Sequence, residues 1–467
     1  MTTTTNVTAD DVLARANALK RTLDASFRDK FVEAIYADAE EIAGKVVQKE
    51  GARRFDLDQR IDKIVTSRVW GLPLMGLMLA VVFWITIVGA NVPSAMIARG
   101  LFWVEDQAAA LFGTIGAPWW LTGFVWHGVY RGLAWVIAVM LPPMAIFFPI
   151  FTILEDLGYL PRVAFNMDKF FKSAGAHGKQ ALTMSMGFGC NAAGVIACRI
   201  IDSPRERLIA ILTNNFVPCN GRWPTLIMLA TIFVAAEFPP AYTSLVAAGS
   251  LMVIVLIGIG MTLLVSAILS RTFLKGEASS FTLELPPYRR PNIRQVLYTS
   301  LIDRTLFVLW RAIVMAAPAG AVIWLMSNVQ LGGQSLTAWV SGWLNPVGYA
   351  IGLDGVILLA YIIALPANEI VVPTILMAYT NSGMMIEMNS LGELQHLLVG
   401  QQGWTLLTAI SLMLFSLLHN PCSTTIWTVY QETKSKKWAA VSGLMPLGIA
   451  FALLFVLNQG ARLAGLL

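Results

Sequence analysis

The sequence predicts an all-α polytopic membrane protein, with about seven full transmembrane helices plus two re-entrant hairpins. Composition is the first observation: 56% of the 467 residues are hydrophobic and only 13% are charged, so one soluble core cannot bury them. The second is a set of uncharged runs that are long enough to cross about 30 Å of hydrocarbon. The third is that several apolar segments are broken at Gly, Pro, Asn or Cys in both halves of the chain.

The first 65 residues predict a cytosolic amphipathic helical segment, followed by a transmembrane domain at 66–467. Apolar residues recur there at three- to four-residue intervals among charged neighbours, which is typical of a helix. The segment before Val69 holds 12 Lys and Arg against 12 Asp and Glu, a balance that argues against a nucleic-acid partner. We expect no signal peptide, because the first long apolar run begins only at Val69. The N-terminus is therefore expected in the cytosol.

The membrane-spanning runs follow in order. The clearest uncharged runs are 69–91, 132–154, 241–270 and 438–461. Residues 404–431 are also uncharged, and 305–328 carries one charge, Arg311. Lys and Arg collect in cytoplasmic loops. This places 155–179, 199–207, 271–304 and 432–437 inside, and 92–130, 329–354 and 381–403 outside. We therefore expect a multi-pass protein of the cytoplasmic (inner) membrane.

Two segments are flanked on both sides by loops of the same face. Residues 180–198 lie between basic loops, and residues 355–380 lie between loops without Lys or Arg. Each should enter and leave the membrane on one side, as a re-entrant hairpin whose broken middle is buried in protein. Suitable breaks are GFGCN at 187–191 and LPANE at 365–369.

These hairpins belong to an internal repeat. A first gate repeat is predicted at 131–237 and a second at 305–432. Each contains an apolar helix with proline, then a hairpin, then a segment with a second break, which is VPCNGRWP at 217–224 and HNPC at 419–422. The predicted topology inverts one repeat relative to the other. Inverted repeats with broken helices are typical of transporters, and the breaks mark the binding site.

The breaks bring polar side chains to membrane depth, where ionisable groups are costly and therefore candidates for function. The predicted metal ligands are Cys190, Cys219, Cys422 and Glu369. The predicted secondary gate residues are Asn191, Asn220, Arg222, Asn368, His419 and Asn420. Thiols, a carboxylate and amide oxygens suit a divalent transition metal such as Fe(II).

Other readings of single residues stay open. The cysteines are expected to be free thiols, and no CxxC or HxxxH spacing indicates structural zinc. Cys198 is interpreted as a packing residue. Glu369 could be the buried partner of Arg222 or Arg311. The remaining histidines, at positions 127, 177 and 396, sit in or near loops without metal-ligand spacing and are not predicted as ligands.

The motifs resemble the membrane domain of the bacterial ferrous iron transporter B (FeoB) family. The resemblance rests on the run at 149–191, on VPCNGRWP, on LELPPYRRP at 283–291, on ANEIVVPTILMAY, on NPCSTTIW and on the span start at 60–75. It covers roughly residues 10–460, and the motifs occur in the family's order.

The resemblance implies an Fe(II) uptake system with two gates. Its gate cysteines correspond to Cys190, Cys219 and Cys422, and its second-gate acidic residue corresponds to Glu369. Three places depart from the family pattern, and they bear on selectivity. Ala192 and Ala193 follow GFGCN in place of Val-Pro, Asn368 replaces a lysine, and His419-Asn420 replaces an aromatic residue and valine.

Family members normally begin with a GTP-binding domain, whose P-loop needs GxxxxGK[ST]. The nearest candidate here, Gly178-Lys179, has Ser173 where the first Gly belongs and Gln180 in place of Ser or Thr. We therefore expect this sequence not to bind GTP. A separate GTP-binding chain or a small cytosolic protein is a candidate partner, and homo-oligomerisation is left open.

The leading hypothesis is transport of Fe(II), as a substrate, through a path lined by cysteine and carboxylate. The protein would be a permease, with no enzymatic activity and no cofactor. One alternative is a permease of the same architecture for Mn(II), Co(II) or a nucleoside-like solute, for which Trp223, Asn214 and Asn215 could supply stacking and amide pairing. The other is a non-transporting membrane regulator.

Overall fold

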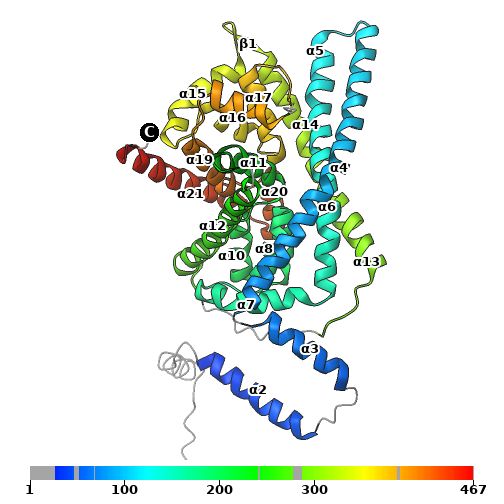
Figure 1. Ribbon diagram of the computed structural model, residues 1–467, viewed down its shortest axis with the longest axis vertical. Helices are drawn as coiled ribbons and strands as arrows, with labels where there is room; N and C mark the ends of the chain where they lie inside the picture. The colour runs from blue at the N-terminus through cyan, green and yellow to red at the C-terminus, as the bar shows by residue number, and fades with distance from the viewer. Residues whose placement is uncertain are drawn as a thin grey trace, which may run out of the picture. The chain divides into compact units, whose positions relative to one another are not determined.

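A computed structural model describes residues 27–46, 52–67, 69–239, 242–276, 287–386 and 390–465 (Figure 1). The chain divides into two compact units, residues 1–61 with 279–284 and residues 62–278 with 285–467. The first unit contains the helix α2 (Phe27–Val46), and α3 (Ala52–Val65) crosses from the first unit into the second. These helices cover part of the predicted N-terminal helical segment, and residues 1–26 of that prediction lie outside the described residues. Its cytosolic placement stays a prediction.

The second unit is helical apart from one short hairpin, β1 (Gln330–Leu331) with β2 (Gln334–Ser335), in the part that the structure describes. Six helices there are long and apolar enough to cross a membrane, and α15 (Leu336–Ala350) with α16 (Gly355–Ile363), bent by 110°, could form a seventh span. The six are Gly71–Thr114, Trp119–Asp156, Thr243–Arg271, Ile293–Asn328, Leu406–Thr433 and Lys436–Leu463. The predicted all-α polytopic membrane fold is confirmed.

The first span, α4 (Gly71–Thr114), is far longer than the run that predicts it. Its 44 residues extend about 66 Å, at about 1.5 Å per residue, whereas the hydrocarbon layer is about 30 Å thick. Pro93 lies inside the helix without ending it. Residues 92–130, expected to form an outside loop, are therefore mostly helical, and α5 (Trp119–Thr122) and η1 (Gly123–Tyr130) follow α4.

The helices that open the two predicted repeats pack on each other. α6 (Arg131–Asp156) runs alongside α4 in Figure 1 and also contacts α14 (Phe307–Asn328). α6 and the turn before it come close to α14 because Gly128 and Gly132 face Gly320. A Cβ on Gly320 would lie only 2.4 Å from the carbonyl oxygen of Gly128. Small residues at such positions allow helix backbones to meet in a membrane.

The rest of the first half is a series of short helices followed by the long helix α12. The first hairpin is present as two helices that pack on each other and meet at Cys190. Ser203 caps the next helix by accepting a hydrogen bond from the Glu206 amide, with Pro204 in the first turn. The elements are α7 (Tyr159–Ser173), α8 (Gln180–Gly189), α9 (Asn191–Ala197), η2 (Cys198–Ile200), α10 (Pro204–Thr213), η3 (Asn214–Phe216), η4 (Asn220–Arg222), α11 (Trp223–Leu229), η5 (Ala230–Val234), η6 (Ala235–Glu237) and α12 (Thr243–Arg271).

The second half repeats this pattern. Its hairpin runs from α16 through a break at Ala367 into α17, and its last broken segment ends in α20, which packs on α9 of the first half. The elements are α13 (Ile293–Tyr298), η7 (Thr299–Leu306), η8 (Asn368–Ile370), α17 (Val371–Thr380), α18 (Leu391–Gln395), η9 (His396–Gln401), α19 (Leu406–Leu418), α20 (Ser423–Thr433) and α21 (Lys436–Leu463). The gate boundaries and their inversion stay predictions.

Candidate functional site

The four predicted breaks meet around one small cavity between the two halves of the second unit. Its volume is about 30 Å³, which is enough for a water molecule or a dehydrated cation but not for an organic solute. The cavity is lined by Met140, Met144, Gly189, Cys190, Asn191, Cys219, Asn220, Gly221, Val308, Ala312, Pro366, Ala367, Asn368, Glu369, Cys422, Thr424 and Thr425.

Seven of the ten predicted site residues line this cavity. They are Cys190, Asn191, Cys219, Asn220, Asn368, Glu369 and Cys422. The other three, Arg222, His419 and Asn420, are not among the lining residues. Cys198 does not line the cavity: its thiol is fully buried, contacts the Gly194 carbonyl at 3.3 Å, and belongs to a separate small apolar cluster. The breaks thus gather three thiols and one carboxylate at one place.

Cys190 reaches the cavity because the chain leaves the helix for one residue. α8 ends at Gly189, Cys190 is extended with φ −154° and ψ 123°, and α9 begins at Asn191. The residue directly before Cys190 has to be glycine, because a Cβ on Gly189 would lie 2.3 Å from the Phe147 ring. The Cys190 carbonyl still accepts a hydrogen bond from the Gly194 amide at 3.0 Å, so the backbone turns without losing this bond.

Cys219 lies in the second break of the first half. α10 ends at Thr213, and the chain is extended from Val217 to Cys219 before η4 begins. Pro218 lacks an amide hydrogen and so cannot continue the helix. The Arg222 amide donates to the Cys219 carbonyl at 2.9 Å, which closes the turn. The thiol therefore lies at the start of a new helix, level with the break at Cys190.

Arg222 is 1% exposed and holds the two halves together through backbone carbonyls. Nη1 donates to the carbonyl of Asn215 and to that of Leu417, both at 2.8 Å, and Nη2 donates to that of His419 at 3.1 Å. Those last carbonyls lie where α19 ends, so they lack helical partners. The Asn420 carbonyl also accepts from Nη2 at 3.4 Å. Arg222 therefore caps a broken helix and does not pair with Glu369.

An asparagine network surrounds this arginine. Asn215 donates to the His419 carbonyl at 2.8 Å, and its Oδ1 accepts from Asn191 at 3.2 Å and from Arg222 at 3.0 Å. Asn214 donates to the Asn191 carbonyl at 3.0 Å. The network connects the Cys190 hairpin to the break at 419–422. From the sequence, Asn214 and Asn215 are candidates only for a nucleoside site, although their place just before a helix break also indicates this structural role.

Glu369 faces the cavity and the backbone of the opposite half. Ala367 is extended, η8 begins at Asn368, and the Glu369 carboxylate then lies beside Gly221, where a Cβ would be 2.3 Å from Oε1. Arg311, its other predicted partner, instead donates to the Thr428 hydroxyl at 3.1 Å and contacts Gln431. Among the described residues, no cation pairs with the Glu369 carboxylate. The described residues therefore offer this buried carboxyl group no compensating positive charge.

At the last break, 419–422, Cys422 lines the cavity and His419 does not. Nδ1 of His419 lies 2.9 Å from the Ser416 carbonyl, and its ring packs on Tyr361. Its Nε2 lies 3.3 Å from the Asn368 side chain, so His419 supports the Glu369 turn and does not line the cavity. The Cys422 thiol lies 3.3 Å from the Thr425 hydroxyl and is partly exposed.

Sequence reasoning missed two thioethers. Met140 and Met144 lie four residues apart on α6, on both sides of Pro142 and Pro143, and both line the cavity. The proline pair in an apolar helix was a visible signal, but which helix face meets the breaks was not. Thioethers are soft ligands, so these two methionines add to the soft donor atoms that the three cysteines bring to the cavity.

The cavity is not a preformed metal centre. Over the described residues, no three His, Cys, Asp or Glu side chains are close enough to hold one metal ion together. To bind a metal ion here, two protein ligands would have to be completed by water molecules, or the walls of the cavity would have to move closer together. A site from which an ion must leave should not hold it tightly.

Comparisons with known proteins match the same region. The family model Gate, described as "Nucleoside recognition", matches residues 137–233 and 309–436. The model for the ferrous iron transport protein B C terminus matches residues 251–303. No solved structure matches the chain.

Several curated relatives are similar over most of the chain. An Fe(2+) transporter FeoB of Staphylococcus aureus is 30% identical over 86% of this chain and 59% of its own length. One of Legionella pneumophila is 27% identical over 97% of this chain and 65% of its length. A fusion protein of Fe(2+) transport protein A and FeoB in Porphyromonas gingivalis is 28% identical over 86% of this chain and 51% of its length. The chain thus spans about three fifths of the first relatives' length.

Proposed function

Because this chain belongs to the FeoB family through its membrane domain, we propose that it moves ferrous iron across the cytoplasmic membrane. The observation that carries the proposal is the cavity, into which three thiols and an unpaired carboxylate project from four separate helix breaks. Cys190, Cys219, Cys422 and Glu369 act as transient ligands. The chain works as a permease, with Fe(II) as its substrate and no catalytic step.

The donor set suits Fe(II) among the cations of the cell. Thiols and thioethers attract transition metals, whereas Mg²⁺ and Ca²⁺ prefer oxygen ligands in larger number. The carboxylate supplies charge, and Asn191, Asn220 and Asn368 supply amide groups at the cavity wall. A mixed set of moderate strength lets Fe(II) bind and leave.

The proposed orientation puts the N-terminal segment, residues 1–65, in the cytosol. The repeats at 131–237 and 305–432 then form two gates that open to opposite sides of the membrane. The cavity lies where both repeats contribute a wall, since Cys190 and Cys219 come from the first and Glu369 and Cys422 from the second.

The membrane potential can drive this transport. Two positive charges crossing an inside-negative potential of about 100 mV release about 4.6 kcal/mol, which corresponds to roughly three decades of accumulation. This sequence contains no P-loop motif, so the proposed flux does not need nucleotide binding by these 467 residues. The relative fused to Fe(2+) transport protein A supports a small cytosolic protein as a partner.

The Gate model's description also raises a nucleoside as the solute. A cavity of about 30 Å³ argues against it, because organic ligands occupy pockets of about 300–1,000 Å³. Mn(II) and Co(II) fit the same cavity and remain alternative substrates, as does a regulatory role without transport.

Uptake by purified protein in liposomes tests the proposal. A potassium gradient with valinomycin sets an inside-negative potential, and radiolabelled Fe(II) is supplied under ascorbate without nucleotide. We expect uptake above that of empty liposomes, inhibition by Co(II) more than by Mg²⁺, and none by uridine. Absence of uptake of any divalent cation would contradict the proposed function.

A further inference from the structure

A second cavity lies at the C-terminal end of α4 and shares no lining residue with the first. It is open to the surface and has a volume of about 430 Å³. It is lined by Gly113, Ala117, Trp119, Thr122, Gly123, His127, Trp324, Asn328, Ser382, Gly383 and Met384. No part of the proposed transport site contributes to it.

With Gly71 at the inner boundary of the hydrocarbon layer, the length of α4 puts this cavity beyond the outer boundary. Glu105, beside the cavity, is 34 residues after Gly71, or about 51 Å along the helix. Even a tilt of about 40° leaves roughly 39 Å, which exceeds the thickness of about 30 Å. In the proposed orientation this is the outer face, where a cation would first meet the protein.

The π-helix η1 and the glycine contact with α14 assemble the cavity. Wide π turns often occur at functional sites, and η1 carries His127. A Cβ on Gly128 would lie 2.8 Å from Cβ of Trp324, so glycine brings α14 close enough for Asn328 to line the same cavity. Asn328 donates through Nδ2 to the carbonyls of Trp324 and Gly383, which leaves its Oδ1 as an acceptor.

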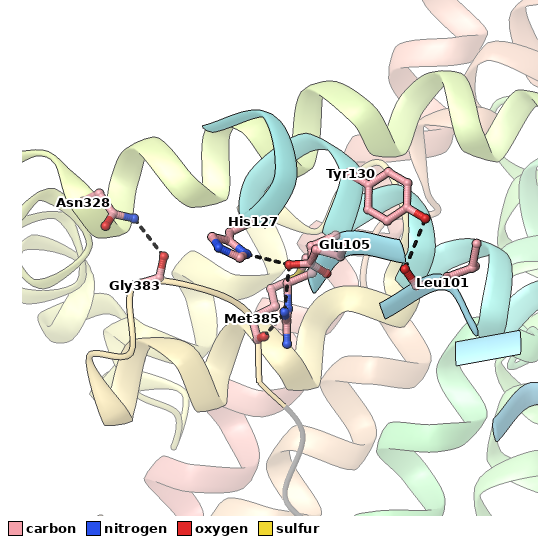
Figure 2. Close-up of polar contacts among 8 residues, drawn as sticks. Leu101, Glu105, His127, Tyr130, Asn328, Gly383 and Met385 are labelled. Carbon is pink, nitrogen blue, oxygen red and sulfur yellow. Dashed lines mark hydrogen bonds and ion pairs between the residues drawn. The ribbon is translucent and has the colours of Figure 1, made fainter. Parts of the chain in front are cut away.

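His127 is held in a fixed orientation by a buried carboxylate. Its Nδ1 lies 2.6 Å from Oε1 of Glu105, and Figure 2 shows the ring pointing at that carboxylate. Glu105 is fully buried, and its Oε2 has no hydrogen-bond partner. Because Nδ1 is engaged, Nε2 is the nitrogen that remains for a ligand. A histidine whose other nitrogen bonds a carboxylate is the usual arrangement of a metal-binding imidazole.

Arg131 balances the charge of Glu105 and ties the cluster to the neighbouring loop. Its Nη1 lies 2.9 Å from Oε1 of Glu105, and its Nε donates to the Met385 carbonyl at 2.7 Å. Figure 2 shows this loop passing beside Glu105 and His127. The arginine prevents Glu105 from acting as a strong ligand itself, so binding should be weak and reversible.

We propose that this cavity is an outer capture site for a hydrated divalent transition metal, with Nε2 of His127 and Oδ1 of Asn328 as ligands. Glu105 is the positioning residue for His127. Imidazole selects transition metals over Mg²⁺ and Ca²⁺. The volume leaves room for bound water, so the ion does not have to lose its hydration shell before it enters. The site rests on the proposed orientation and supplies metal to the transport cavity.

Direct metal binding tests the site without requiring transport. Co(II) binding is measured on the full chain in detergent, in a Cys190→Ser/Cys219→Ser/Cys422→Ser background that removes the thiols of the transport cavity. We expect His127→Gln to raise the dissociation constant at least tenfold, and the matched control His396→Gln to leave it unchanged. Equal Co(II) binding by the His127→Gln protein would overturn the proposal.

Two more variants keep the test independent of folding damage. Asn328→Asp adds a negative charge to the site but removes the two hydrogen bonds that Nδ2 donates, so its thermal unfolding is measured as well. If it unfolds like the wild type, it should lower the dissociation constant for Co(II) several-fold, and unchanged or weaker binding by that folded variant overturns the role of Asn328. Glu105→Gln should weaken Co(II) binding. In liposomes it should also raise KM for Fe(II) while leaving the maximal rate intact, whereas an equal loss of both would mean that Glu105 is only structural.

The two proposals can fail separately. If wild-type protein transports no cation but Co(II) binding still depends on His127, the proposed function fails and the outer site stands. If Fe(II) uptake is normal and His127→Gln changes neither KM nor Co(II) binding, the outer site fails and the transport function stands.

Discussion

The backbone amide of Ser423 donates to the carbonyl oxygen of Leu365 over 2.8 Å. Ser423 and Leu365 are 58 residues apart in the sequence, and this bond joins the two breaks of the second half, as does the contact of 3.3 Å between His419 Nε2 and the Asn368 side chain. One break then presents Glu369 and the other Cys422 to the same cavity. The donor set of the site is thus fixed by backbone contacts between breaks, and the following predictions test its parts.

Replacing Glu369 by Gln should lower the initial rate of Fe(II) uptake at least about tenfold. The carboxylate is the unpaired charge in the cavity, and its attraction for a divalent ion should exceed the roughly 1.4 kcal/mol that corresponds to a factor of ten. The measurement is uptake into liposomes at equal protein content. Glu237→Gln, at an exposed carboxylate in η6, is the matched control and should keep the wild-type rate.

Replacing Gly221 by Ala should block uptake while the protein stays folded. The new methyl group would lie 2.3 Å from Oε1 of Glu369 and would displace the carboxylate from the cavity. Gly260→Ala is the control, because nothing lies within 4 Å of a Cβ there. If Gly221→Ala transports Fe(II) at the rate of the control, Glu369 does not act from its present position.

Replacing Arg222 by Met should lower the free energy of unfolding by about 3 kcal/mol or more. The change leaves the carbonyls of Asn215, Leu417 and His419 without a charged donor in a buried position. Thermal unfolding in detergent measures it. Arg199→Met is the control, since Arg199 is 67% exposed and its ion pair with Glu432 should contribute less than about 1 kcal/mol. If both variants had the same free energy of unfolding, Arg222 would not stabilise the fold by capping the broken helix.

The four thiols should differ in reactivity. Cys422 is partly exposed, whereas Cys190, Cys198 and Cys219 are buried. A small methanethiosulfonate reagent should therefore modify Cys422 first and Cys198 last, as followed by mass spectrometry. Co(II) should slow the reaction of Cys422 and leave that of Cys198 unchanged. If Co(II) slowed the modification of Cys198 to the same extent, the metal would be reducing access to the whole protein and not only to the cavity.

The sequence predicted the breaks but not their partners. Glycine, proline and asparagine around Cys190 and Cys422 have local backbone preferences, which a single sequence displays. Which carbonyls Arg222 binds depends on how α19 ends beside η4, and the approach of Met140 depends on the rotation of α6. Neither follows from spacing along the chain.

Charge and hydropathy also misjudged the extent of α4. The positive-inside rule reads only loops, so the segment after Asn91 looked like an outside loop because it holds the single basic residue Arg99. Helix packing against α6 continues the helix past Pro93 to Thr114. His127 has no metal-ligand spacing around it in the sequence, because its partner Glu105 is 22 residues away and meets it where η1 packs on α4.

Uptake of Fe(II) by a Cys190→Ser/Cys219→Ser/Cys422→Ser protein shows whether the ion crosses the membrane on these three thiols. The comparison uses liposomes with an inside-negative potential, with wild-type and Cys198→Ser proteins measured side by side. We expect the triple variant to lose nearly all potential-driven uptake and Cys198→Ser to keep it. Wild-type uptake by the triple variant would contradict the claim that Fe(II) passes through this cavity on its thiols.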